Sequence, residues 1–190
     1  LKISGGGFSV AFDMQKGQMI SFQSSGQELL KKGPEPGFWR APTDNDFGNN
    51  MPVRARMWRK AGENRVVTNT NIEEAGKGQV RVTFEFDLQD QEGKKIGDYS
   101  STYLVKGNKE VEVNNQFQMA EGDLPEIPRM GMTLHMPKEY DQMTWLGRGP
   151  HESYQDRKTS AFVDLYSGSV ADQYWPYLRP QENGNKTDVR

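Results

Sequence analysis

Two pairs of acidic residues have a spacing that could support hydrolysis of a glycosidic bond. Asp44 and Asp46 lie in GFWRAPTDNDFG, residues 37–48, while Glu152 and Asp156 lie in HESYQD. Such hydrolysis needs two carboxyl groups on opposite sides of a sugar, roughly 5 to 9 Å apart. The chain holds 26 acidic residues, so two neighbours are weak evidence for such a pair. The competing interpretation is that these acids cap turns and form ion pairs with nearby Arg40, Arg148 and Arg157.

The oxygen-rich run DNDFG raises the question of a metal site. An EF-hand needs oxygen ligands at positions 1, 3 and 5, glycine at 6 and glutamate at 12. Counted from Asp44, positions 5, 6 and 12 hold Gly48, Asn49 and Ala55, so the EF-hand pattern is absent. Two histidines without any cysteine make a poor transition-metal ligand set. A carboxylate site of another kind stays open, but we expect no metal site.

The two histidines allow a weaker case for acid–base chemistry. His151 precedes Glu152, and such a pair could act as acid and base on a sugar hydroxyl. One dipeptide is weak evidence, and His135 falls on the polar face of a predicted strand, where a surface role is expected. No Ser/His/Asp arrangement stands out. The three glycines at 5–7 precede a predicted strand rather than a helix, so they do not form a phosphate loop.

Aromatic and polar residues are mixed in two later segments, WLGRGPHESYQDRK (145–158) and QYWPYLRPQENGNKTD (173–188). Trp and Tyr faces stack on sugar rings, while Arg, Asp, Asn and Glu bond to hydroxyl groups. The alternative is that Trp39, Trp145 and Trp175 simply anchor long loops. Disordered segments rarely carry so many rings, so we predict ordered loops.

Alternation of apolar and polar residues predicts the strands that position these loops. Apolar residues at every second position from Val80 to Leu88 predict a strand with one buried face. The same alternation occurs in residues 8–12, 111–119 and 130–136. A run rich in Thr and Tyr predicts a further strand at 99–105. Short turns that contain glycine lie at 13–17, 75–78, 90–94 and 106–108. We therefore predict an all-β sandwich of antiparallel sheets.

A single helix is predicted, over MPVRARMWRKAG at residues 51–62. Pro52 suits the first helical position, and Gly62 can end the helix. The apolar stripe would consist of Val53, Met57 and Ala61, beside Trp58. The stretch GFWRAPTDNDFG fits neither a strand nor a helix, and we predict a loop there.

Composition excludes several classes of function. The net charge of −2, with interspersed signs, gives no electrostatic case for binding nucleic acid or an anionic membrane. No run of 18 apolar residues is present to span a bilayer. The absence of cysteine removes disulfides, thiolate zinc sites and thiol nucleophiles. It does not decide between the cytoplasm and the periplasm. We interpret both ends of the chain as internal positions of a longer protein.

Three motifs in order carry a resemblance that extends over the whole chain. FWRAPTDND (38–46), WLGRGPHESYQDRK (145–158) and YLRPQENGNKTDVR (177–190) closely resemble the C-terminal small-chain domain of family 2 β-galactosidases. The resemblance implies an antiparallel supersandwich related to galactose mutarotases. In that family it follows a jelly roll, two immunoglobulin-like domains and a TIM barrel with the two catalytic glutamates. The family continues past Arg190 with further strands and a substrate-platform tryptophan, so the domain is expected to be truncated at its C-terminus.

The resemblance also suggests which residues approach the active site. The segment corresponding to RAPTDND lies near the mouth of the barrel in the family. The residues expected near substrate are therefore Arg40, Thr43, Asp44, Asn45 and Asp46. Secondary polar loops contribute His151, Glu152, Tyr154, Arg157, Glu182 and Asn183. The resemblance implies that no catalytic residue and no cofactor lies in this chain, and that any Mg²⁺ and Na⁺ of the intact enzyme bind in the barrel.

Three functions follow as alternatives. The first is a fragment of a retaining β-galactosidase that supports the active site with a loop and is inactive alone. Its expected partners are the remaining domains of the enzyme, a galactoside substrate and further copies in a homo-oligomer. The second is a stand-alone carbohydrate-binding module. The third is a mutarotase-like epimerase with His151 and Glu152 as acid and base.

Overall fold

A computed structural model describes residues 1–190, which form two compact units. Unit 1 comprises Leu1–Trp39 and Arg54–Pro137, and unit 2 comprises Arg40–Val53 and Lys138–Arg190. All strand pairs are antiparallel, so the predicted all-β class is confirmed. No helix has both the length and the apolar character needed to cross a membrane.

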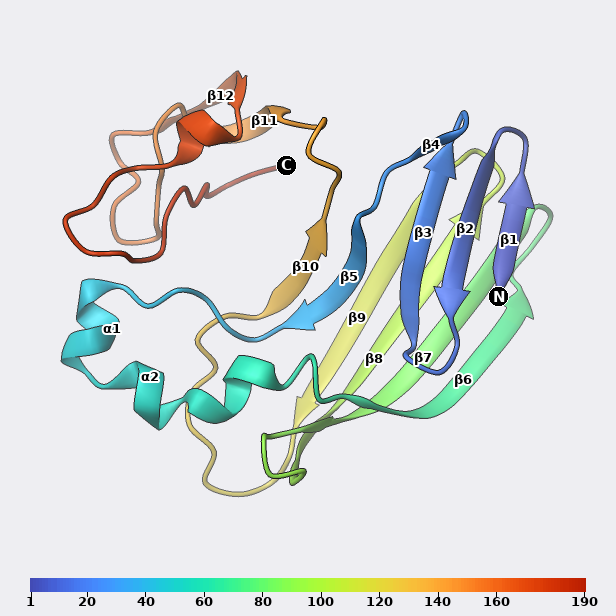
Figure 1. Ribbon diagram of the computed structural model, residues 1–190, viewed down its shortest axis with the longest axis horizontal. Coiled ribbons are helices and arrows are strands. Elements are labelled where there is room, and N and C mark those ends of the chain that lie inside the picture. The colour runs from blue at the N-terminus through green and yellow to red at the C-terminus, as the bar shows by residue number, and fades with distance from the viewer. The chain divides into compact units, whose positions relative to one another are not determined.

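Unit 1 contains two four-stranded sheets that join strands adjacent in sequence. The first sheet consists of β1 (Lys2–Gly5), β2 (Phe8–Asp13), β3 (Gln18–Ser24) and β4 (Gln27–Glu28). The second consists of β6 (Val66–Glu74), β7 (Gln79–Gln89), β8 (Lys95–Lys106) and β9 (Val111–Met119). The first sheet lies against the second, blue against green and yellow (Figure 1). A separate pair is formed by β5 (Lys32–Gly37) and β10 (Gly131–His135).

The core of unit 1 is aromatic. The ring of Phe12 from β2 lies 5.2 Å from that of Tyr103 on β8 and 6.1 Å from that of Phe84 on β7, measured between centroids. Four of the five apolar residues predicted to share a face of β7 are fully buried: Val82, Phe84, Phe86 and Leu88. Turns connect β2 to β3, β6 to β7, β7 to β8 and β8 to β9 at the predicted positions.

Two predicted strands are confirmed, although their apolar faces are only partly buried. Val113 and Met119 of β9 are 40% and 45% exposed, and Leu134 of β10 is 50% exposed. β9 is an edge strand, and β10 pairs only with β5, so alternation alone overstated their burial. A period-two pattern identifies a strand but does not guarantee a second layer against it.

The predicted helix over 51–62 is not continuous. It divides into the one-turn α2 (Met51–Arg54) and the 3₁₀ helix η1 (Arg56–Lys60). Trp58 is fully buried in unit 1, packs 5.9 Å from Phe38 between ring centroids and donates its indole N–H to the Pro125 carbonyl at 2.9 Å. Val53, which the sequence placed on an apolar stripe with Met57 and Ala61, is instead 58% exposed. Tertiary burial of Trp58 outweighs helical periodicity in this segment.

Unit 2 is built on the hairpin of β11 (Gln142–Gly149) and β12 (Phe162–Ser169), followed by the 3₁₀ helix η2 (Ala171–Gln173). The C-terminal segment is joined to β11 by two backbone hydrogen bonds. Arg148 N–H donates to the Thr187 carbonyl at 3.1 Å, and Arg190 N–H donates to the Leu146 carbonyl at 2.9 Å. These two bonds fasten the last residues to β11.

Candidate functional site

Every predicted site residue lies in unit 2, and an ion pair organises the first group. Asp46 is buried and accepts hydrogen bonds from both terminal nitrogens of Arg40, with Nη2 to Oδ1 at 3.0 Å. Its Oδ2 also accepts from the backbone N–H of Thr43 at 2.7 Å and from the Thr43 hydroxyl at 2.9 Å. Burial alone raises the pKa of Asp46, but the bonds from Arg40 and Thr43 outweigh it, and the pKa lies below its ordinary value.

The same contacts correct the expectation of a loop. Residues Asp44–Gly48 form the short helix α1, and Thr43 is its N-cap. The Thr43 hydroxyl accepts from the backbone N–H of Asp46 at 3.3 Å while Asp46 accepts from Thr43, which is a capping box. Thr-x-x-Asp was the sequence signal for this helix, with aspartate in the place usually held by glutamate. The cap leaves Asp44 and Asn45 exposed at the first turn.

Residues 40–46 are joined to a segment far away in sequence. The N–H of Glu182 donates to the Pro42 carbonyl at 3.3 Å, and the N–H of Asp44 donates to Gln181 Oε1 at 3.3 Å. Asp46, and then the charge of Glu182, raise the pKa of Arg40 against the opposing effect of burial. The structure therefore brings the first and third sequence motifs together.

Glu152 is the centre of a second cluster. One carboxylate oxygen accepts from the Tyr177 hydroxyl and from Arg157 Nη2, the latter at 3.2 Å. The other accepts from the Gly184 N–H at 2.9 Å. The Arg157 guanidinium also lies 4.5 Å from the centroid of the Tyr154 ring. One carboxylate thereby links two loops, 150–161 and 174–184.

The remaining predicted residues have local roles. His151 is exposed, and its Nε2 lies 3.0 Å from the Ser160 hydroxyl. Its hydrogen bond is thus separate from those of Glu152. Asn183 accepts from the Trp175 N–H at 2.7 Å and donates to the Trp175 carbonyl, so it fixes that stretch of backbone. Trp175 itself is 60% exposed, which contradicts the expectation that it anchors its loop, while Trp145 is buried as expected.

Ion pairing was the simpler interpretation of the acids, and the structure confirms it for Arg40 with Asp46 and for Arg157 with Glu152. Arg148 pairs with Asp188 instead of one of the acids considered from the sequence. In residues 1–190 no three His, Cys, Asp or Glu side chains come together as a metal ligand set.

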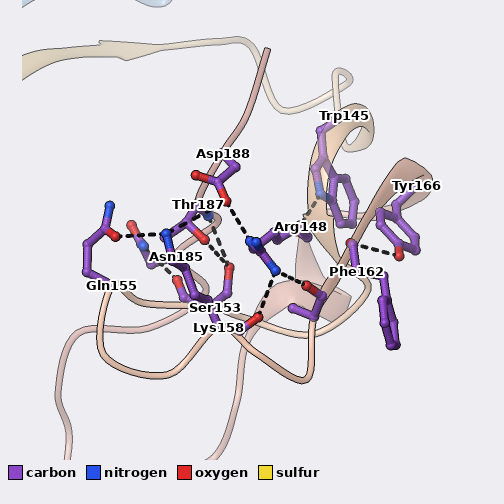
Figure 2. Close-up of polar contacts among 11 residues, drawn as sticks. Trp145, Arg148, Ser153, Gln155, Lys158, Phe162, Tyr166, Asn185, Thr187 and Asp188 are labelled. Carbon is purple, nitrogen blue, oxygen red and sulfur yellow. Dashed lines mark hydrogen bonds and ion pairs between the residues drawn. The ribbon is translucent and has the colours of Figure 1, made fainter.

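A buried polar network that sequence reasoning missed supports these loops (Figure 2). The Ser153 hydroxyl lies 2.9 Å from that of Thr187 and accepts from the Thr187 N–H at 3.0 Å, and both side chains are buried. Arg148 lies at the centre of the view, and donates to the carbonyls of Lys158 and Ala161 at 3.1 and 2.7 Å. These partners are far apart in sequence, so no local pattern marks them.

Comparison with known proteins agrees with the motifs. The family model described as beta galactosidase small chain matches residues 4–190. A β-galactosidase of Priestia megaterium is 41% identical over 190 residues, which cover 100% of this chain and 18% of that protein. The β-galactosidases of Halalkalibacterium halodurans and Lactobacillus delbrueckii subsp. bulgaricus are 34% and 35% identical, covering 99% and 100% of this chain. Each is likewise matched over 18% of its own length. The chain belongs to the β-galactosidase small-chain family.

Proposed function

We propose that this chain is one part of a β-galactosidase that hydrolyses terminal β-D-galactosides. Its membership of the small-chain family supports this function, as do the names of its relatives. Since the chain matches only 18% of the length of those relatives, its partners in this function are the remaining domains of the same enzyme.

In this role unit 2 borders the substrate site without supplying a catalytic carboxylate. The observation that supports this point is the bonding of two acids with little exposed side chain, 10% for Asp46 and 11% for Glu152. Asp46 is held by Arg40 and Thr43, and Glu152 by Arg157, Tyr177 and Gly184. A carboxylate occupied by several donors is poorly available to transfer a proton or attack a sugar. These acids therefore shape the loops.

The groups offered to substrate are the exposed ones on α1. Asp44 and Asn45 lie at a turn whose backbone is fixed by the capping box and by the bond from Glu182 to Pro42. Polar side chains on a rigid turn can order a substrate hydroxyl at little entropic cost. This arrangement would support a neighbouring active site by orientation and by exclusion of water.

The test is kinetic and uses the full-length enzyme. The double variant Asp44→Ala/Asn45→Ala should lower kcat/KM for a chromogenic β-galactoside by about 10-fold, or about 1.4 kcal/mol of transition-state stabilisation. Its melting temperature should stay that of the native enzyme, because neither side chain is buried. Asp123→Ala, an exposed acid of unit 1, is the matched control. Native kinetics in the double variant would assign α1 a purely structural role.

A further inference from the structure

A second site suited to sugar lies within unit 1. A cavity of about 200 Å³ is bounded by β5, β10 and η1. It is smaller than the roughly 300 to 1,000 Å³ of sites for drug-sized ligands, so it suits a ligand of one ring. Its lining includes Lys32 and Glu35 from β5, Thr133 and His135 from β10, and Trp39 just after β5.

The aromatic component of the cavity is the ring of Trp39. Trp39 is half-buried, and the Arg59 guanidinium of η1 lies 6.0 Å from its ring centroid. Trp58, which also lines the cavity, is fully buried against Phe38. The half-buried indole of Trp39 therefore offers a sugar ring an apolar face to stack on.

The polar component places donors and acceptors side by side. Thr133 lies opposite Glu35, and His135 opposite Lys32, in the register of β10 and β5. The Lys32 ammonium lies 2.6 Å from a carboxylate oxygen of Glu35, whose side chain is only 19% exposed. Gly37 matters here, because a side chain at that position would begin 3.1 Å from the Thr133 hydroxyl. Its absence leaves this hydroxyl accessible.

The charges around the cavity select the class of ligand. Lys32 and Arg59 are balanced by Glu35 and Glu63, all four of which line it. A balanced set of charges gives no net attraction to an anion or a cation. Neighbouring acceptors and donors do match the vicinal hydroxyl groups of a neutral sugar.

We infer that this cavity binds one neutral pyranose ring, of the class of galactose or a methyl galactoside. This binding goes beyond the proposed function, because it needs only residues of unit 1 and no hydrolysis. An affinity on the order of 1 mM is expected for a ligand of this size in a shallow site.

Hydrogen–deuterium exchange with mass spectrometry can test the inference on the full-length protein. Galactose should slow exchange saturably in peptides covering 32–39 and 131–135, with half-maximal effect in the millimolar range. Trp39→Ala should weaken this effect at least about 10-fold by removing the stacking face. Thr133→Val, which keeps the shape of the side chain, should weaken it as well. Trp175→Ala, which changes an exposed tryptophan of unit 2, should leave it unchanged.

The outcomes separate this inference from the proposed function. If the protein hydrolyses galactosides but galactose gives no saturable protection of the two unit 1 peptides, the inference is overturned and the proposed function is not. Protection that persists in both Trp39→Ala and Thr133→Val would also overturn it. Protection of those peptides in a protein without hydrolytic activity would support the sugar site and count against the proposed function.

Discussion

Replacing Asp46 by alanine removes the acceptor of four hydrogen bonds in unit 2. Two come from Arg40 and two from Thr43, and the bond from the Thr43 backbone N–H forms one half of the capping box of α1. The substitution therefore acts on an ion pair and on a helix start together. We expect it to loosen residues 40–48 and to lower both stability and galactoside turnover.

The magnitude follows from the exposure of the pair. Hydrogen bonds to charged groups contribute about 1.5 to 3 kcal/mol, whereas the bond from the residue 46 N–H to the Thr43 hydroxyl is kept in the variant. The Asp46 side chain is 10% exposed, but that of Arg40 is 26% exposed, so water replaces part of what the arginine loses. We expect Asp46→Ala to lower the free energy of unfolding by about 2 to 3 kcal/mol.

The effect should depend on pH in a definite direction. The hydrogen bonds from Arg40 and Thr43 outweigh burial and hold the folded pKa of Asp46 below that of an unfolded aspartate, which is about 3.9. The stabilisation is thus fully present above the unfolded pKa, and is lost as the pH falls through the folded pKa. Asp46→Asn keeps the size of the side chain but removes its charge. Its deficit in stability should be constant near neutral pH and shrink in acid.

Urea unfolding across pH gives the stability, and kcat/KM of the full-length enzyme gives the activity. Asp44→Ala is the matched stability control, because Asp44 is exposed and its change should cost less than about 0.5 kcal/mol. Equal stability of Asp46→Asn and the native protein at neutral pH would refute the reasoning. So would a deficit that stays the same down to the lowest pH at which the protein is folded.

Three further predictions concern buried groups. Burial raises the pKa of Tyr103 to about 12. The stability that this residue contributes should therefore be lost as the pH rises above the pKa of an unfolded tyrosine, which is about 10. An ultraviolet titration in which all tyrosines of the folded protein ionise normally would contradict this. Gly62→Ala would place a carbon 1.8 Å from a backbone carbonyl oxygen, so it should lower the free energy of unfolding in urea by more than about 2 kcal/mol. Gly48 has open space around it, so Gly48→Ala should be neutral or slightly stabilising. Equal effects of the two substitutions would count against the packing argument. Ser153→Ala and Thr187→Val should each lower the free energy of unfolding by about 1 to 3 kcal/mol. In a double-mutant cycle the two effects should be less than additive. Additive effects would mean that the two hydroxyl groups do not interact.

The elements that could be predicted from the sequence are those with one buried face. β7 is the clearest case, because Val82, Phe84 and Phe86 point into the core from every second position. β12 was missed for the opposite reason. Phe162 and Leu165 are 75% and 65% exposed, and apolar residues occur on both faces of FVDLYSGS, so no alternation marks the strand.

The candidate site was predictable only in part, for reasons of sequence distance. Arg40 and Asp46 are six residues apart, and their pairing could be considered from the sequence alone. The Ser153 hydroxyl meets that of Thr187 from 34 residues away, and no local pattern indicates that contact. The capping box at Thr43 lay between these limits. The spacing of Thr43 and Asp46 could be recognised in the sequence, but the third helical position holds aspartate in place of the usual glutamate or glutamine.

The division between local and distant contacts bears on which side chains can vary. The ion pairs of Arg40 with Asp46 and of Arg157 with Glu152 are local in sequence, whereas residues 40–46 are joined to a distant segment through the backbone bond from Glu182 to Pro42. Backbone groups persist when side chains change. The shape of residues 40–46 should therefore survive substitution of Asp44 and Asn45, whose side chains are exposed. Substitutions there should alter galactoside kinetics while leaving the fold intact, whereas changes at Asp46 should alter both.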